Sequence, residues 1–324
     1  MSLIRVGVLR GGPSSEHEVS LKTGEAVLAN LPKKYFGHDI FIEKNGEWNM
    51  DGRYAYPEKV FRNVDVVFNA LHGYFGEDGK VQSIMEHHSV LYTGSGALAS
   101  AMGMNKQMAK GAFKKVGLKT PRGILLDSGL SAEQAGKMIF GAISPPWVVK
   151  VVNGGSSVGV FIIKDFSSLV DNLETILSPS GGERIMVEEY IWGKEATCGV
   201  IDNFRGETVY ALPVVEIKPA VGHSFFDNES KYGGQAQEII PANFSLTEKR
   251  EIEKMARLAH DAIGARHYSR SDFIISKNGI YILEINTLPG LTSESLLPKA
   301  MNAVGSSYGE LLDHLITMAM GKLI

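Results

Sequence analysis

Residues 270–286 decide the fold, and they read Arg270-Ser-Asp272-Phe-Ile-Ile-Ser-Lys-Asn-Gly-Ile-Tyr-Ile-Leu-Glu284-Ile-Asn286. Two apolar runs flank Lys-Asn-Gly at 277–279, a pattern typical of a β-hairpin with glycine where the backbone needs a positive φ. With all three as the loop, Asp272 faces Glu284 and Arg270 faces Asn286, so these four side chains share one face. The opposite face, which we expect in the core, carries Phe273, Ile275, Leu283 and Ile285.

The polar face of this hairpin predicts a metal site. Carboxylates directly opposite each other, such as Asp272 and Glu284, lie roughly 4.5–5.5 Å apart at Cβ and repel. A hard cation between them removes that repulsion, and the Asn286 amide adds another oxygen donor. Oxygen-only donors favour Mg²⁺ bound together with substrate phosphates. Two alternatives stay open: a solvated charged face, or a two-residue loop that shifts the register by one.

A glycine-rich loop, Asn153-Gly-Gly-Ser-Ser at 153–157, joins two apolar strands predicted at 147–152 and 158–163. Its backbone N–H groups and the hydroxyls of Ser156 and Ser157 could wrap a polyphosphate. It lacks the Gly-Lys-Ser/Thr ending of a P-loop. A plain hairpin turn is the alternative.

Lys150 lies near the end of the strand before that loop, among apolar residues. Lysine is rare in a strand that faces a core, so its position suggests a buried anionic partner. The alternative is an edge lysine whose ammonium reaches solvent.

The first 95 residues alternate strand and helix patterns, which predicts a mostly parallel sheet with helices on its faces. Val19–Leu31 has helical spacing, and Ser15-x-x-Glu18 resembles a capping box. Predicted boundaries at 93–96 and 178–183 divide the chain into segments 1–95, 96–183 and 184–324. The class is α/β, with α+β character in the C-terminal half.

Several loops carry candidate ligand groups. Gly11-Gly12-Pro-Ser-Ser-Glu16 enters a helix as an anion-binding or substrate loop would, although Glu16 could simply complement the helix dipole. His72 closes an apolar strand at its C-terminal end, where it is either structural or catalytic. Gly290 offers a backbone N–H, and Ser295 can cap a helix or hold a carboxylate.

The composition excludes several classes of protein. The 324 residues carry 33 basic and 36 acidic side chains, so no broad basic field exists for nucleic acid or an anionic membrane. One cysteine excludes an internal disulfide and a Cys-rich zinc site. No apolar run approaches the roughly 20 residues of a membrane helix. We expect a soluble cytoplasmic protein.

Taken together, five motifs resemble the D-alanine–D-alanine ligase family, in the family order and over nearly the whole chain. They are Gly11-Gly12-Pro-Ser14-Ser-Glu16-His-Glu-Val19-Ser20, His72-Gly-Tyr-Phe-Gly76-Glu77-Asp78-Gly79, Gly155-Ser156-Ser157-Val158-Gly159, Lys231-Tyr232 and Glu284-Ile-Asn286-Thr-Leu-Pro289-Gly290. The resemblance implies an ATP-grasp fold of three α/β domains with ATP between the second and third. It implies ATP-dependent joining of two D-alanines through an acyl phosphate, for peptidoglycan precursor synthesis.

The resemblance also implies a role for each matching residue. Glu16 would orient the first substrate and link with Ser156 and Tyr232 to close a lid, with His72 near the substrate. The nucleotide contacts would be Lys106, Lys150, Ser157, Glu188, Glu189, Ile191, Glu195 and Lys231. Two Mg²⁺ or Mn²⁺ ions would bind Asp272, Glu284 and Asn286. Arg270 and the Gly290 N–H would stabilise an oxyanion, and Ser295 and the Leu296 N–H would bind the second substrate.

The sequence departs from the family pattern at Ser271, at Val151 and in the loop at 226–230, which leaves the second substrate less constrained than the reaction type. Tyr232 favours D-alanine over D-lactate, because lactate-using relatives usually lack this tyrosine. Two other functions stay open: a ligase for a different D-amino or D-hydroxy acid, and a catalytically silent nucleotide-binding regulator. The resemblance further implies a homodimer.

Overall fold

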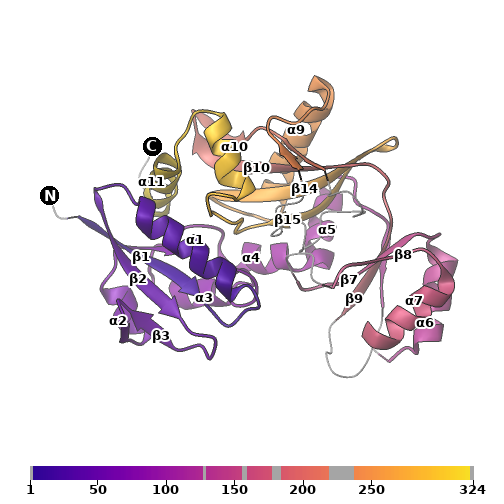
Figure 1. The fold of residues 1–324 in the computed structure, drawn as a ribbon, viewed down its shortest axis with the longest axis horizontal. Coiled ribbons are helices and arrows are strands. Elements are labelled where there is room, and N and C mark those ends of the chain that lie inside the picture. The colour runs from indigo at the N-terminus through magenta and orange to yellow at the C-terminus, as the bar shows by residue number, and fades with distance from the viewer. Residues whose placement is uncertain (1–2, 127–128, 155–158, 177–183, 219–236, 322–324) are drawn as a thin grey trace.

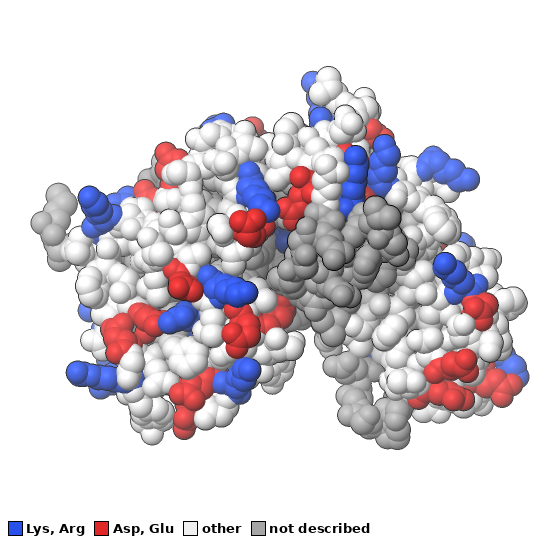
Figure 2. Space-filling model, viewed as in Figure 1, with Lys and Arg blue, Asp and Glu red and all other residues white. Residues whose placement is uncertain are grey.

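The computed structural model describes residues 3–126, 129–154, 159–176, 184–218 and 237–321. Its strands form three separate sheets with helices packed on them, which confirms the α/β class (Figure 1). Basic and acidic side chains are interspersed over the visible face, as the near-balanced composition predicts (Figure 2). No described helix is long and apolar enough to cross a membrane.

The first sheet has the order β4-β3-β2-β1-β5, and β1 pairs in parallel with both of its neighbours. The strands are β1 (Ile4–Gly11), β2 (Tyr35–Ile42), β3 (Trp48–Met50), β4 (Arg53–Tyr54) and β5 (Val66–Asn69). The helices of this region are α1 (His17–Asn30), α2 (Pro57–Arg62) and α3 (Lys80–His87). The carboxyl ends of β1 and β5 lead into the Gly11-Gly12 loop and into His72, so both loops open on the same edge.

The N-terminus of α1 differs from the prediction. The helix begins at His17 with Glu16 as N-cap and no side-chain capping bond, so the predicted capping box of Ser15 and Glu18 is wrong. The hydroxyl of Ser14 instead accepts a hydrogen bond from the Glu16 N–H and donates one to the His72 carbonyl. The loop is therefore tied to the loop after β5 as well as to α1, where the Ser20 hydroxyl accepts from the Gly11 N–H at 2.8 Å and His17 Nδ1 lies 2.6 Å from the Gly12 carbonyl oxygen.

The second sheet is antiparallel, in the order β6-β9-β7-β8. Its strands are β6 (Gly123–Leu125), β7 (Trp147–Val151), β8 (Phe161–Ile163) and β9 (Ile185–Glu189). Helices α6 (Ala132–Ala142) and α7 (Phe166–Ile176) pack on it around the buried Trp147 and Leu169 (Figure 1). Although β9 lies in the predicted third segment, it pairs with β6 and β7 of this sheet.

The third sheet runs β13-β12-β10-β14-β15, with β11 paired to β10. Its strands are β10 (Lys194–Phe204), β11 (Glu207–Ala211), β12 (Val215–Lys218), β13 (Gln237–Ile239), β14 (Tyr268–Ser276) and β15 (Gly279–Asn286). Within the described residues, the other helices are α4 (Ala97–Met104), α5 (Lys106–Lys115), α9 (Leu246–Ala262), α10 (Leu296–Ala303) and α11 (Tyr308–Ala319). Cys198 lies in the core under α9, where burial raises the pKa of its thiol, as expected of a packing residue.

Core residues also join the third sheet's helices to the first sheet. One buried cluster contains Val6 and Val8 of β1 together with Leu297 of α10 and Leu311 and Leu315 of α11. The end of the chain therefore packs back on its beginning (Figure 1). The loop at 288–295, which precedes α10, is held beside the N-terminal loops.

We expect replacement of Ser245 with Ala to destabilise α9 by about 1 kcal/mol. The Ser245 hydroxyl accepts a hydrogen bond from the Glu248 N–H at 3.2 Å, and the Glu248 carboxylate accepts from the Ser245 N–H at 2.8 Å. Hydrogen exchange of the first-turn amides should quicken in the Ala variant. A Ser245→Asn control keeps a capping oxygen and should exchange nearly as slowly as the wild type. Equal exchange in all three would contradict this role.

Candidate functional site

The hairpin of β14 and β15 forms, but its loop is shorter than predicted. Ser276 pairs with Gly279, so the loop holds two residues, and pairing near the turn is shifted by one. A β-bulge then restores the register: Phe273 pairs with Ile282 but Asp272 pairs with Glu284. The predicted pairs Asp272–Glu284 and Arg270–Asn286 are therefore both present. They form because the shorter loop and the bulge cancel, which counting residues from a three-residue loop does not predict.

The bulged residue is Leu283, whose predicted core position is wrong. Leu283 instead lines a cavity beside Glu284, because the extra residue reverses the alternation of faces. Its neighbour Ile282 takes the core position and is fully buried. Phe273 and Ile285 are buried as predicted.

The polar face of the hairpin is held by charged and hydroxyl neighbours. Asp272 accepts hydrogen bonds from Arg270 at 3.1 and 3.3 Å and from the Thr197 hydroxyl of β10 at 2.6 Å. Burial lowers the pKa of Arg270, but the attraction of Asp272 outweighs burial and the net pKa is raised. Glu284 lies 3.8 Å from the Lys106 ammonium. Arg270 is thus a fixed cation, and Asp272 is oriented from two strands.

The donor set fits a hard cation. Asp272 and Glu284 are directly paired across the hairpin, and Asn286 lies one alternation further along the same strand as Glu284. The Asn286 side-chain oxygen already accepts from the Leu288 N–H at 2.8 Å, so this amide oxygen is turned and held. Among described residues, no three His, Cys, Asp or Glu side chains are grouped to hold a metal. Two carboxylates and one amide oxygen suit Mg²⁺ bound with further ligands from phosphates.

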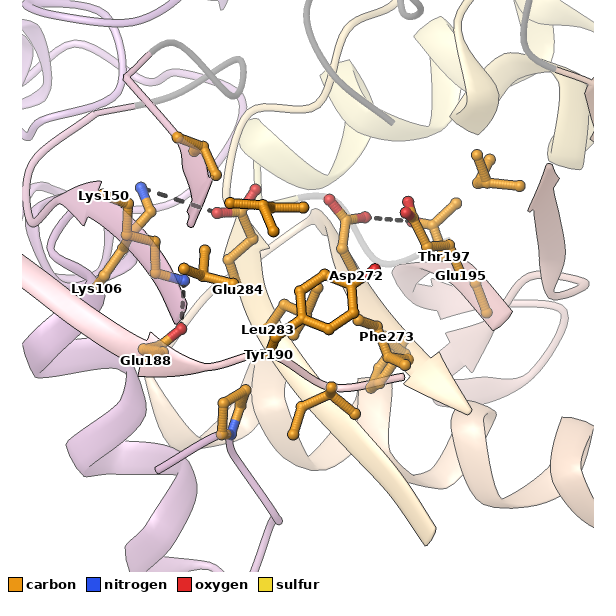
Figure 3. A pocket seen from close by; sticks show the side chains of 18 of the residues that line it. Lys106, Lys150, Glu188, Tyr190, Glu195, Thr197, Asp272, Phe273, Leu283 and Glu284 are labelled. Atoms are coloured by element: carbon orange, nitrogen blue, oxygen red, sulfur yellow. Dashed lines mark hydrogen bonds and ion pairs between the residues drawn. The ribbon is translucent and has the colours of Figure 1, made fainter. Parts of the chain in front are cut away.

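Three buried charged side chains lie beside this hairpin. Lys150 of β7 forms an ion pair with Glu188 of β9 at 2.6 Å, which confirms the predicted buried anionic partner of Lys150. Glu188 forms a second ion pair at 2.6 Å with Lys110 of α5. Burial raises the pKa of Glu188, but attraction from Lys150 and Lys110 outweighs it and holds the pKa below its usual value. Figure 3 shows Lys150, Glu188 and Lys106 near Glu284.

A cavity between the second and third sheets contains this charged corner. Besides the charged groups, it is lined by apolar side chains, including Ile162, Phe273 and Ile274, and by Ile191 in the connection after β9. Figure 3 shows Phe273 and Leu283 on this apolar side. Glu189 and Glu195 also line it. An apolar slot that ends in cations and carboxylates suits a flat base attached to phosphates.

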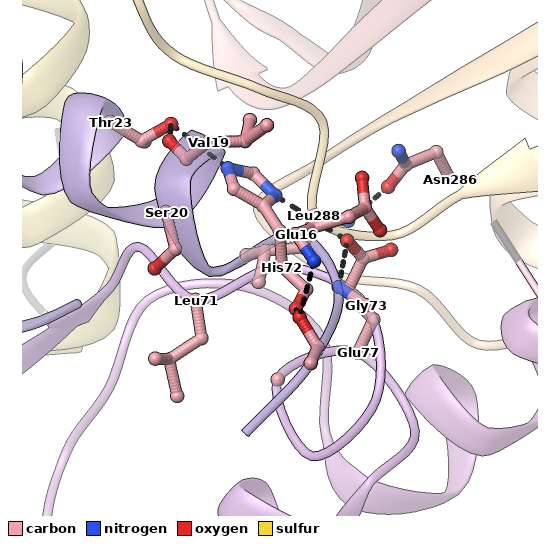
Figure 4. A network of polar contacts seen from close by, with 12 residues as sticks. Glu16, Val19, Ser20, Thr23, Leu71, His72, Gly73, Glu77, Asn286 and Leu288 are labelled. Carbon is pink, nitrogen blue, oxygen red and sulfur yellow. Dashed lines mark hydrogen bonds and ion pairs between the residues drawn. The ribbon is translucent and has the colours of Figure 1, made fainter. Parts of the chain in front are cut away.

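A second cleft lies between the first sheet and the third. It is lined by Glu16, His72, Gly290, Ser295 and Leu296, which come from the loops after β1 and β5, from the loop before α10 and from the first residue of α10. Figure 4 shows the side chains of Glu16 and Glu77 on the side of Asn286 of β15, while the His72 ring lies beside Thr23. The predicted substrate residues that the structure describes are therefore brought together in one cleft.

His72 is buried at the floor of this cleft. Its Nε2 lies 2.9 Å from the Thr23 hydroxyl and its Nδ1 lies 3.4 Å from Glu77. Gly73 has a φ of +68°, and a Cβ there would lie 2.8 Å from a Glu16 carboxylate oxygen. Glycine at 73 therefore makes room for the Glu16 side chain. In the loop at 288–295, a Cβ on Gly290 would lie 3.0 Å from the Ser295 hydroxyl oxygen.

The two cavities share part of their lining: Lys106, Arg270, Glu284 and Leu296. Lys106 also donates to the Gly154 carbonyl at 2.5 Å, so it links α5, the glycine-rich loop and β15. A ligand in the first cavity and a ligand in the second would meet at cations and carboxylates. This geometry is suited to the transfer of a charged group between them.

Comparison with known families identifies the chain. A model of the D-ala D-ala ligase C-terminus matches residues 113–317, and one of the D-ala D-ala ligase N-terminus matches residues 5–60 and 50–95. The chain belongs to the D-alanine–D-alanine ligase family. The expected ATP-grasp fold agrees with this membership and with related solved structures.

Three relatives illustrate the similarity. A D-alanine–D-alanine ligase of Sinorhizobium medicae is 39% identical over 325 residues, covering 96% of each chain. A D-alanine–D-alanine ligase structure from Bacillus anthracis, complexed with ATP, is 32% identical with a TM-score of 0.78 and covers 98% of each chain. The VanG D-Ala:D-Ser ligase structure from Enterococcus faecalis is 29% identical with a TM-score of 0.83, over 98% of this chain and all of that one.

Four residues that are predicted to act in this D-alanine–D-alanine ligase lie outside the described residues. They are Ser156 and Ser157 in the glycine-rich loop, and Lys231 and Tyr232 in the stretch predicted as a lid. Their roles stay predictions.

Sequence reasoning missed Lys110 and Thr197, which position the acidic groups of this D-alanine–D-alanine ligase site. Lys110 follows Lys106 by four residues, so the two lysines share one face of α5. That spacing is a signal that could have drawn attention to Lys110. Thr197 gave no such signal, since its contact with Asp272 depends on the pairing of β10 with β14.

Proposed function

We propose that the protein joins two D-alanine molecules at the expense of ATP, forming D-alanyl-D-alanine and ADP for peptidoglycan precursor synthesis. The observation that carries the proposal is the meeting of two cavities at Lys106, Arg270 and Glu284. A nucleotide in one and an amino acid in the other would place phosphate and carboxylate at this point. The names of the relatives, and the ATP in the Bacillus anthracis structure, support the identities of the ligands.

On the nucleotide side, the base would lie in the apolar slot beside Glu188, Glu189 and Ile191, and the ribose near Glu195. Lys106 and Lys150 would contact the phosphates from two sides, because both ammonium groups border the same cavity. Ser157 and Lys231 complete the proposed contacts. Such a site catalyses phosphoryl transfer through positioning and charge neutralisation rather than covalent chemistry.

On the substrate side, the Glu16 carboxylate would hold the ammonium group of the first D-alanine, turning its carboxylate toward the phosphates. That carboxylate would attack the γ-phosphorus of ATP, giving an acyl phosphate and releasing ADP. The amine of the second D-alanine, after losing its ammonium proton, would then attack the carbonyl carbon of the acyl phosphate, and phosphate would leave as the peptide bond forms. Arg270 and the Gly290 N–H would stabilise the oxyanion of the tetrahedral intermediate. Ser295 and the Leu296 N–H, at the start of α10, would hold the second carboxylate.

Asp272, Glu284 and Asn286 would hold two Mg²⁺ or Mn²⁺ ions, whose charge screens the phosphates when bound. The lid proposed to include Tyr232 would link with Ser156 and Glu16 and exclude water from the acyl phosphate. His72 would remain part of the first-substrate wall, with its two ring nitrogens turned to Thr23 and Glu77.

We expect phosphate release from ATP to be fastest with D-alanine in a panel that also contains L-alanine, D-serine and D-lactate, by at least about tenfold over the others. The measurement is Mg²⁺-dependent phosphate release, with the dipeptide product identified in parallel. A preference for D-serine or D-lactate as second substrate would indicate the alternative ligase. Release with none of them would indicate a silent nucleotide-binding regulator.

The Tyr232→Phe variant is assayed with the same substrate panel as the wild type. We expect the variant to lose selectivity for D-alanine over D-lactate, because the proposed link through its hydroxyl is removed. Unchanged selectivity would count against that link.

The remaining parts of the proposal concern organisation. Domains at 1–95, 96–183 and 184–324 are supported by the three sheets, although among the described strands β9 pairs across the second boundary. The family resemblance supports a cytoplasmic homodimer. Sedimentation of the purified protein tests the oligomeric state directly.

A further inference from the structure

Lys110 is a buried cation that lines neither cavity of the site. It is 5% exposed, while its ion-pair partner Glu188 is 2% exposed and Lys150 is 7% exposed. Lys150 and Glu188 both line the nucleotide cavity, but Lys110 is absent from the described lining of that cavity and of the substrate cleft. Any effect of Lys110 on a bound ligand therefore passes through its ion-pair partner Glu188.

Holding this lysine as a cation is costly. Burial, together with the neighbouring Lys150 ammonium, lowers the pKa of Lys110 to about 8, against the attraction of Glu188. A packing role alone would be served by an apolar side chain of similar length, since replacing buried ion pairs by apolar residues is often neutral or stabilising. The retained charge needs another explanation.

The geometry of the three charges suggests that explanation. Glu188 contacts both lysines at 2.6 Å, through different carboxylate oxygens. With Lys110 present, the trio carries one net positive charge. Without Lys110, the Glu188 carboxylate would be balanced by Lys150 alone, and the ammonium that borders the nucleotide cavity would offer the phosphates little net charge.

We propose that Lys110 is a positioning residue that neutralises Glu188 and so leaves the Lys150 ammonium available to nucleotide phosphates. The proposal rests on the proposed function, since it deepens the account of the same nucleotide site. It concerns phosphate recognition and not the base, because Lys110 does not border the apolar slot.

The test compares two probes, ADP with Mg²⁺ and adenosine, by calorimetric titration of the full chain. In Lys110→Met, we expect ADP affinity to fall by about tenfold or more, the order contributed by one nearby charge at a partly buried site. Adenosine affinity should stay within about twofold. Lys114→Met is the matched control, since Lys114 lies one turn further along α5 and is exposed, and both affinities should be unchanged.

A double variant, Lys110→Met with Glu188→Gln, keeps the test decisive if the single variant folds poorly. Removing both charges again leaves one net positive charge, so the ratio of ADP to adenosine affinity should return toward the wild-type value. The ratio is used because Glu188 borders the base as well.

Equal loss of ADP and adenosine affinity in Lys110→Met would overturn the proposal and indicate a structural role. Unchanged ADP affinity, or a double variant whose ratio stays low, would overturn it as well. These measurements need no turnover, so they stay separate from the substrate panel. If the wild type binds ADP but releases no phosphate with any amino acid, the proposed ligase function is wrong. The titrations would still decide whether Lys110 supports phosphate binding.

Discussion

Glu284→Gln should abolish Mg²⁺-dependent strengthening of nucleotide binding and lower kcat by about a thousandfold or more. The substitution keeps the size of the side chain but removes an anionic oxygen opposite Asp272 and 3.8 Å from Lys106. Hard divalent cations bind carboxylate oxygens far better than amide oxygens in such sites. The measurement is ATP affinity across a Mg²⁺ titration, followed by phosphate release with D-alanine.

Glu294→Gln is the matched control for this experiment. It removes the same charge from a residue that lines the same cleft, but its side chain is 84% exposed and its described ion pair is with Lys299. We expect its Mg²⁺ titration to overlay that of the wild type, because exposed ion pairs contribute little. Glu284→Gln with an unchanged ATP affinity at every Mg²⁺ concentration would remove the metal site from the proposal.

The hairpin shows how far sequence patterns reach in this protein. Alternation along residues 270–286 predicts which polar side chains face each other, and Asp272 and Glu284 do face each other. The path differs, because the two-residue loop shifts the pairing and the bulge at Leu283 shifts it back. A bulge is set by twist and by packing on both faces, which a period of two along one strand does not encode.

The charged corner of the nucleotide cavity was predictable only in part. An apolar strand with one lysine predicts a buried anion beside Lys150, and that anion is Glu188. Lys110 reaches the same carboxylate from α5, about 80 residues earlier in the chain. The spacing from Lys106 indicates only which face of α5 carries Lys110. The carboxylate that it meets depends on how α5 lies against the second and third sheets, which no local pattern encodes.

Arg270→Met should lower kcat for dipeptide formation by roughly 10²- to 10³-fold, the usual loss when one donor to an oxyanion is removed. Arg270 borders both cavities and is locked by two hydrogen bonds to Asp272, so its guanidinium is preorganised where charge would develop. We expect KM for ATP to change by only a few fold, since the two lysines beside the nucleotide remain. Initial rates of dipeptide formation at varied ATP provide both constants.

The reaction step that fails in Arg270→Met distinguishes two roles of Arg270: stabilising the oxyanion, or orienting Asp272 of β14. If Arg270 acts on the tetrahedral intermediate, the acyl phosphate still forms reversibly in the variant. Isotope exchange between the β,γ-bridging oxygen of ATP and the nonbridging oxygens of its β-phosphate should then persist while dipeptide synthesis falls. Arg270→Lys keeps the charge but loses the paired grip on Asp272, so it should retain more activity than Met and less than the wild type. If exchange and ATP affinity collapse together with dipeptide synthesis, Arg270 serves mainly to orient Asp272, and the oxyanion must be stabilised by other donors such as the Gly290 N–H.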